Sequence, residues 1–127
     1  ISHFGNHAVL HPAGGIGGGL QPLVMGDAKL TAAAQQRAEE IATVNSHVRP
    51  NGTKWYTVLS EYGVTDAAAG ENAAWGSVSP EEVVNAWMNS EGHRANILDP
   101  EARAMGVGYY YNSSSTWGHQ WIQLFTK

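Results

Sequence analysis

The chain has no cysteine among its 127 residues, so neither a disulfide nor a thiol nucleophile can contribute to its stability or chemistry. Charge is also scarce: acidic and basic residues make up 14% of the chain, and the formal net charge is -4. This balance provides no basic surface of the kind that binds nucleic acid or anionic membranes. No apolar run approaches the roughly 20 residues of a membrane-spanning helix. The motifs HExxH and GxSxG are absent too, which removes two common sequence signs of a hydrolase.

The length favours one domain, large enough to bury about two-thirds of the surface of its unfolded chain. Its beginning is unusual because five glycines fall between positions 14 and 19. Three histidines there are spaced by four residues and could share a metal ion on one helix face: His3, His7 and His11. Gly5 and Pro12 oppose such a helix, so we expect an irregular lead-in over 1–19 and one domain over 20–127. Because the first residue is Ile1 and not methionine, we also expect that a leader was removed.

The clearest periodic pattern begins at Asp27, a good helix N-cap. Apolar positions then recur at helical spacing on one face: Leu30, Ala34, Ala38 (or Arg37), Ile41 and Val44. The polar residues are assigned to the other face: Gln35, Gln36, Glu39 and Glu40. The pattern predicts an amphipathic scaffold helix that packs on a sheet.

A second helix start lies at Ser79, with Pro80 in the first helical position and Glu82 three residues after the cap. Residues 53–62 predict a further short helix, which Gly63 ends. Alternating side chains over 106–111 and 117–125 predict an antiparallel hairpin around a polar turn. Its aromatic residues are interpreted mainly as core, although Trp117, His119 and Trp121 could also form a binding face.

Three groups of polar residues are candidates for a site. His93, Arg94 and Asn96 interrupt the apolar pattern of the second helix region, and we expect Arg94 and Asn96 to bond loop carbonyls near the site. His47 follows the end of the first helix, where a histidine often only complements the last carbonyls. Glu71 is flanked by glycine, alanines and a tryptophan. Burial of Glu71 would require a partner, so it either has its pKa tuned beside imidazoles or bonds backbone amides in a loop.

Four ordered segments carry a family resemblance: SHVRPNG (46–52), GENAAWG (70–76), SPEEVVNAWMNSEGHRANILDP (79–100) and MGVGYY (105–110). Together they resemble the CAP superfamily of cysteine-rich secretory, antigen 5 and pathogenesis-related proteins, in the cysteine-free form typical of bacterial SCP-like members. The resemblance implies an α+β fold, a three-layer α-β-α sandwich with a central, mainly antiparallel sheet. It also implies an exported, extracellular protein.

The family's cleft contains two histidines and usually two acidic residues. By resemblance, the histidines fall on His47 and His93 and the first acid falls on Glu71. The second acid falls on Ser90, so only three of the four positions match. Glu91 is adjacent but is turned about 100° away on a helix.

Two imidazoles and one carboxylate suit a divalent cation, most simply zinc. Three functions follow as hypotheses. In the first, a secreted binding module holds the cation at His47, His93 and Glu71 and acts through a small-molecule, lipid or protein ligand. In the second, a peptidase-like hydrolase uses the same three residues, with a carboxylate orienting a histidine that activates water. In the third, the cluster is purely structural.

Overall fold

The computed structural model describes residues 23–127, and the expected lead-in with His3, His7 and His11 lies outside them. Eight elements follow in order: β1 (Val24–Met25), α2 (Ala28–Glu40), α3 (Thr57–Glu61), β2 (Ala68–Trp75), α4 (Pro80–Met88), α5 (Glu91–Ile97), β3 (Ala104–Tyr111) and β4 (His119–Thr126). The strands form one sheet in the order β1-β3-β4-β2. Only the β1–β3 pair is parallel. The predicted α+β fold with a mainly antiparallel sheet is therefore confirmed.

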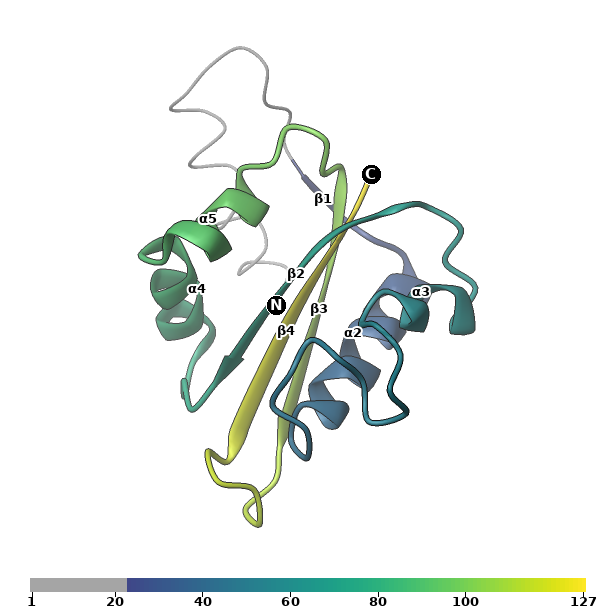
Figure 1. Ribbon diagram of the computed structural model, residues 1–127. Coiled ribbons are helices and arrows are strands. Elements are labelled where there is room, and N and C mark those ends of the chain that lie inside the picture. The colour runs from purple at the N-terminus through teal and green to yellow at the C-terminus, as the bar shows by residue number, and fades with distance from the viewer. Residues whose placement is uncertain (1–22) are drawn as a thin grey trace.

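Helices cover both faces of the sheet, with α2 and α3 on one side and α4 and α5 on the other (Figure 1). Side chains of β4 alternate between the two sides, as the pleat of a strand requires. Trp121 and Phe125 join the hydrophobic cluster under α4 and α5, whereas Ile122 and Leu124 join the cluster under α2 and α3. All four side chains are buried because each face of the sheet has its own core.

The helix starts agree with the sequence. Asp27 caps α2 by accepting hydrogen bonds from the amides of Lys29 and Leu30. Ser79 caps α4 by accepting from the amide of Glu82, 3.1 Å away. Both caps satisfy amides at a helix N-terminus that have no partner within the helix. Two spans needed correction. The short helix covers only 57–61 of the expected 53–62, and Trp117 lies in the hairpin turn, before β4 begins.

The close contact between α2 and the sheet depends on glycine in β3. A Cβ atom at Gly108 would overlap the carbonyl group of Ala34 and lie 2.7 Å from the amide nitrogen of Gln35. The side chains of α2 at this contact are also small: Ala33 and Ala34 are completely buried there. The Gln35 side chain then accepts a hydrogen bond from the amide of Tyr109, 3.1 Å away. The helix is thus fixed over the middle of the sheet.

Candidate functional site

The C-terminal half of α2 carries a buried arginine that binds two carboxylates. Arg37 is fully buried, and its Nε and Nη2 atoms donate to the two oxygens of Glu71 at 2.7 and 3.1 Å. Its Nη1 atom donates to Glu40 at 2.9 Å. Burial alone would lower the pKa of Arg37, but the two carboxylates outweigh burial and raise it. Arg37 therefore remains charged in the interior because both of its partners are negative.

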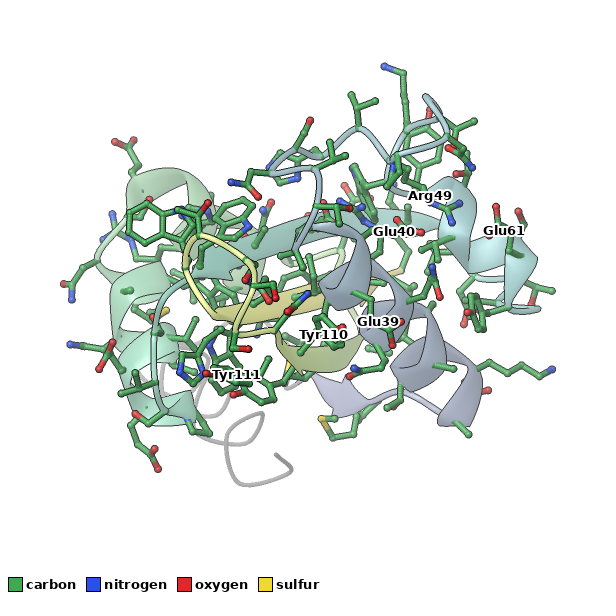
Figure 2. The ribbon with its side chains drawn as sticks, turned by 90° about the horizontal axis from the view of Figure 1, so that it is seen from below. Glu39, Glu40, Arg49, Glu61, Tyr110 and Tyr111 are labelled. Atoms are coloured by element: carbon green, nitrogen blue, oxygen red, sulfur yellow. The ribbon has the colours of Figure 1, made fainter. Side chains whose placement is uncertain are left out.

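The ion pairs continue away from the sheet (Figure 2). Arg49 is buried as well and donates to Glu40 at 2.8 Å and to both oxygens of Glu61 at 2.7 and 2.9 Å. The result is an alternating series of side chains from four segments: Glu71, Arg37, Glu40, Arg49 and Glu61. The expectation that Glu40 faces solvent is wrong. Glu40 is only 8% exposed because Arg37 and Arg49 bind it, whereas its neighbour Glu39 is exposed.

This network predicts a specific acid sensitivity. Burial alone would raise the pKa of the Glu40 carboxyl, but hydrogen bonds from Arg49, Gln36 and Arg37 lower it to about 2. Because the folded-state pKa lies below the unfolded value, the resulting stability is present above pH 4.5 and is lost as pH falls toward 2. We expect Glu40→Gln to lower the free energy of unfolding at pH 7 by up to about 3 kcal/mol.

The difference in the free energy of unfolding between Glu40→Gln and the wild type should narrow as pH falls from 4.5. Urea denaturation at a series of pH values will measure it. Glu39→Gln is the matched control: the same change, one residue away, on an exposed carboxylate. A constant difference between the wild type and Glu40→Gln across this pH range would contradict the assignment.

At its other end the network reaches His47. The Oε1 atom of Glu71 lies 2.6 Å from Nδ1 of His47, and Ser46, the residue before it, accepts a hydrogen bond from Arg37 through its carbonyl. An ionised carboxylate can only accept, so Nδ1 of His47 carries the proton and Nε2 carries the lone pair when the ring is neutral. The hydrogen bond to Glu71 raises the pKa of His47, against a smaller opposing effect of burial. The side chain of His47 is nevertheless 59% exposed.

The second histidine, His93, lies on α5, opposite β2, the strand that carries Glu71. Nδ1 of His93 is 2.9 Å from the hydroxyl of Ser90, the residue that precedes α5, and the carbonyl of His93 accepts from Asn72 at 3.1 Å. Burial lowers the pKa of His93, and the positive charge of His47 lowers it further. The two imidazoles thus differ in character: Glu71 favours the protonated form of His47, and burial favours the neutral form of His93.

Buried amides join α5 to the sheet. Asn72 is fully buried in β2, donates to Gln123 of β4 at 3.0 Å and accepts from Asn96 of α5 at 2.8 Å. Arg94 donates to the carbonyl of Met88, the last residue of α4, at 3.3 Å, and Asn96 donates to the carbonyl of Glu71 in β2 at 3.4 Å. Both bond backbone carbonyls, but of a helix end and a strand instead of a loop. Sequence reasoning did not identify Asn72 as functional. Its signal was available: a polar side chain next to Glu71 in an otherwise small and apolar segment.

Glu71 lies in β2 with its side chain completely buried, and not in a loop. Both of its oxygens are bound, by Arg37 and by His47. Among the residues 23–127, no three His, Asp or Glu side chains are grouped as ligands of one ion. Glu71 is therefore placed to orient His47, and the two histidines are the residues of the cluster that keep an unengaged ring nitrogen. We call His47 and His93 the two-histidine site.

The chemistry of a hydrolase is only partly represented. Ser90 and His93 form a hydroxyl–imidazole pair, and Glu71 and His47 form a carboxylate–imidazole pair. A nucleophilic triad needs hydroxyl, imidazole and carboxylate in a single series. In the part of the chain that the structure describes, the hydroxyl and the carboxylate bind different histidines. The Glu71–His47 pair is nevertheless the arrangement in which a carboxylate orients a histidine to activate water, so the hydrolase hypothesis stays a prediction.

The aromatic residues of the hairpin are arranged separately. The hydroxyl of Tyr109 lies 2.6 Å from Nδ1 of His119, and the Tyr109 and Trp121 rings pack with their centroids 4.5 Å apart. Trp121 is buried, whereas Trp117 is 58% exposed on the turn. His119 is thus held by the partly buried Tyr109 at the start of the central strand β4, and a binding role for this face stays a prediction.

The fold and the site define a class before any comparison: a small α+β domain with helices on both faces of its sheet, a buried glutamate that binds one histidine, and a second histidine on α5. The model of the cysteine-rich secretory protein family, CAP, matches residues 17–125. The chain therefore belongs to the CAP family, and the resemblance of the four motifs is confirmed.

The relatives are bacterial. The chain is 42% identical over 106 residues to the protein YkwD of Bacillus subtilis (strain 168), which covers 82% of this chain and 40% of that protein. An extracellular protein with an SCP domain from Bacillus anthracis has a TM-score of 0.72 at 27% identity, covering 85% of this chain and 34% of the other. An outer surface protein of Borrelia burgdorferi, at 23% identity, shares the fold with a TM-score of 0.71, covering 85% and 79%.

The chain spans about two-fifths of the length of YkwD and about one-third of the Bacillus anthracis protein. Within the described residues, none of the helices has the length and apolar character needed to cross a membrane.

Proposed function

We propose that this CAP domain is an exported binding module in which His47 and His93 together hold a divalent cation, zinc being the best match for two imidazoles. The ion in turn would contact a small-molecule, lipid or protein ligand. Export is supported by the family and by the extracellular relative from Bacillus anthracis. The observation that carries the proposal is the state of His47: its ring is 59% exposed, yet its Nδ1 is fixed by a buried carboxylate at 2.6 Å.

The donor set fits a two-histidine site. Histidines that bind metals usually donate their other ring nitrogen to a carboxylate or another oxygen, which fixes the tautomer and orients the ring. The rings of His47 and His93 are held in this way by Glu71 and Ser90. We propose that Glu71 acts through His47 and is not itself a ligand, because Arg37 and His47 already use both of its oxygens. Water or the bound partner would complete the coordination.

Calorimetric titration with zinc tests the proposal. It is best done in a variant with His3→Ala, His7→Ala and His11→Ala, so that the N-terminal histidines cannot contribute. In that background we expect His47→Ala and His93→Ala each to weaken zinc binding at least tenfold, since each removes one of the two protein ligands. His119→Ala is the matched control and should leave binding unchanged, because His119 lies on β4 and is not one of the two proposed ligands.

The pH dependence is part of the same prediction. Zinc binds the neutral imidazole, and Glu71 raises the pKa of His47. When the pH is lowered, zinc affinity should therefore begin to fall while the pH is still above 6.5, the ordinary pKa of histidine. Equal zinc affinity in the background variant and in its His47→Ala, His93→Ala and His119→Ala derivatives would refute the two-histidine site. Absence of zinc binding, with lower melting temperatures for His47→Ala and His93→Ala, would favour a structural role of the cluster.

A further inference from the structure

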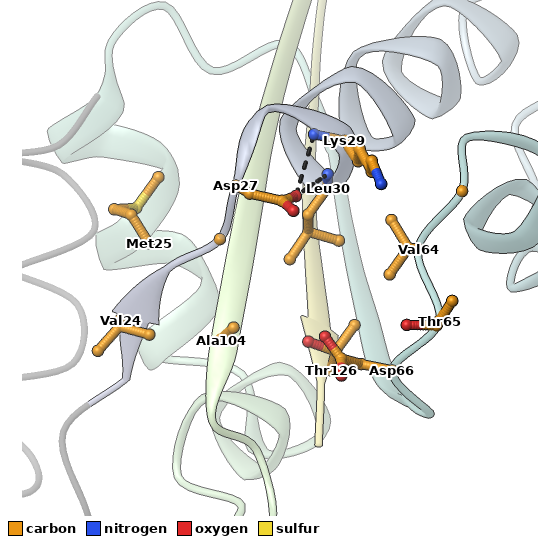
Figure 3. A pocket seen from close by; sticks show the side chains of 12 residues that line it. Val24, Met25, Asp27, Lys29, Leu30, Val64, Thr65, Asp66, Ala104 and Thr126 are labelled. Atoms are coloured by element: carbon orange, nitrogen blue, oxygen red, sulfur yellow. Dashed lines mark hydrogen bonds between the residues drawn. The ribbon is translucent and has the colours of Figure 1, made fainter.

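A separate cavity of about 310 Å³ lies at one end of the sheet, and it shares no residue with the two-histidine site. It is bounded by the N-terminal end of α2, the segment after α3 and the ends of β3 and β4 (Figure 3). Its inner wall includes Leu30, Val64 and Ala104, all of which belong to or pack against the core under α2. Thr126 completes this wall, and we call the cavity the Thr126 pocket. Ligand sites are typically apolar cavities with a few placed polar groups, from roughly 300 Å³ upward.

The hydroxyl of Thr126 is the unusual feature of this pocket. Because β4 alternates, Thr126 faces the same side of the sheet as Ile122 and Leu124, which are buried under α2. Thr126 is also fully buried, but its Oγ1 atom has no hydrogen-bond partner in the described part of the chain. Folded proteins leave few buried polar groups unpaired, and each one requires an explanation. A ligand in the adjoining cavity would supply the missing partner.

The charged residues of the pocket are arranged at two ends. Figure 3 shows Thr126 and Asp66 at one end and Lys29 at the other, beside Asp27. Asp27 is occupied in capping α2. The Lys29 stem packs along Gly63. Lys29 and Asp66 are both exposed, and among the residues 23–127 no hydrogen bond or ion pair engages the Lys29 ammonium group or the Asp66 carboxylate. The pocket thus offers a carboxylate with a hydroxyl at one end and a cation at the other.

We propose that the Thr126 pocket binds a small zwitterion of the amino-acid or dipeptide class. The Asp66 carboxylate pairs with the ligand's ammonium group, and the Thr126 hydroxyl accepts a hydrogen bond from the same group. Lys29 pairs with the ligand's carboxylate at the other end. The cavity lies at the lower end of the size range of ligand sites, which suits a molecule of this size.

Alanylalanine is a suitable probe. Its binding to the whole chain can be monitored by two-dimensional amide NMR. We expect it to shift the amide signals of Val64, Ala104 and Thr126 in a saturable manner. N-acetyl-alanylalanine, which has no ammonium group, and alanylalanine amide, which has no carboxylate, should bind at least fivefold more weakly, since each loses one charged contact. Equal binding of the acetylated form, or no shift of these signals by any probe at tens of millimolar, would overturn the proposal.

Thr126→Val tests the hydroxyl directly because valine keeps the shape of the side chain. We expect about fivefold weaker binding of alanylalanine together with a melting temperature at least as high as that of the wild type, since an unpaired buried hydroxyl is removed. Thr31→Val, on the exposed side of α2, is the matched control, and His47→Ala should leave alanylalanine binding unchanged. Unchanged alanylalanine binding in Thr126→Val would refute a role for the hydroxyl, whatever the result at the two-histidine site.

Discussion

Replacing Arg37 with methionine is expected to lower the free energy of unfolding by about 3–5 kcal/mol, the usual cost of removing one partner from a buried ion pair. The substitution leaves the carboxylates of Glu71 and Glu40 without the guanidinium that binds both in the interior. Urea denaturation at pH 7 measures the loss. Arg94→Met is the matched control: Arg94 is exposed and makes one long hydrogen bond, so its replacement should change stability by less than about 0.5 kcal/mol.

The pH dependence of the Arg37→Met defect separates electrostatics from packing. Without Arg37, the Glu71 carboxylate is buried with only His47 as a partner, so little remains to compensate the burial of its charge. An uncompensated buried negative charge costs stability at neutral pH, and acid relieves the cost by removing the charge. The defect should therefore shrink between pH 7 and pH 5. A defect that does not change with pH would mean that only packing was lost.

Gly108→Ala is expected to have an effect of similar size, for a steric reason. The new Cβ atom would overlap the Ala34 carbonyl group, which belongs to the backbone of α2 and cannot rotate away as a side chain could. The helix must move off the sheet, which breaks the hydrogen bond from the amide of Tyr109 to Gln35. Overpacking typically costs about 1–3 kcal/mol and occasionally more, and the clash with helix backbone places Gly108→Ala at the upper end of that range. Chemical denaturation of Gly108→Ala against the wild type measures the loss.

Gly92→Ala is the control for the same change of residue. Gly92 lies inside α5, and a Cβ atom there meets no other atom within 4 Å. Alanine is the better helix former, so we expect Gly92→Ala to raise the free energy of unfolding by about 0.5–1 kcal/mol. Similar losses in the two variants would contradict the idea that α2 is held directly against β3.

The sequence predicted those parts of the fold that depend on local patterns. The caps at Asp27 and Ser79 are read from residue type and spacing, and the hairpin is read from alternation, so both could be placed without long-range information. The sheet order could not be read in this way. It is set by the meeting of segments far apart in the sequence, such as β2 with β4. The family resemblance anticipated a central, mainly antiparallel sheet but not the order of its strands.

The site illustrates the same division. Resemblance singled out Glu71 and the two histidines, and burial of Glu71 beside an imidazole was one of the two readings of its neighbourhood. Arg37 was missed as its partner. A signal was present, because an arginine at an apolar position of a helix requires a buried anion. Tertiary packing decides which anion the arginine binds. The helical pattern alone therefore assigned Glu40 wrongly to the exposed face.

The most direct test of the two-histidine site is an NMR titration of the histidine rings in the variant without His3, His7 and His11, with and without zinc. We predict that the pKa of His47 lies above about 6.5 and that of His93 below it, as Glu71 and burial respectively require. Zinc should then shift the ring signals of both residues and leave those of His119 unchanged. Two ordinary pKa values, with no response of either ring to zinc, would contradict the account.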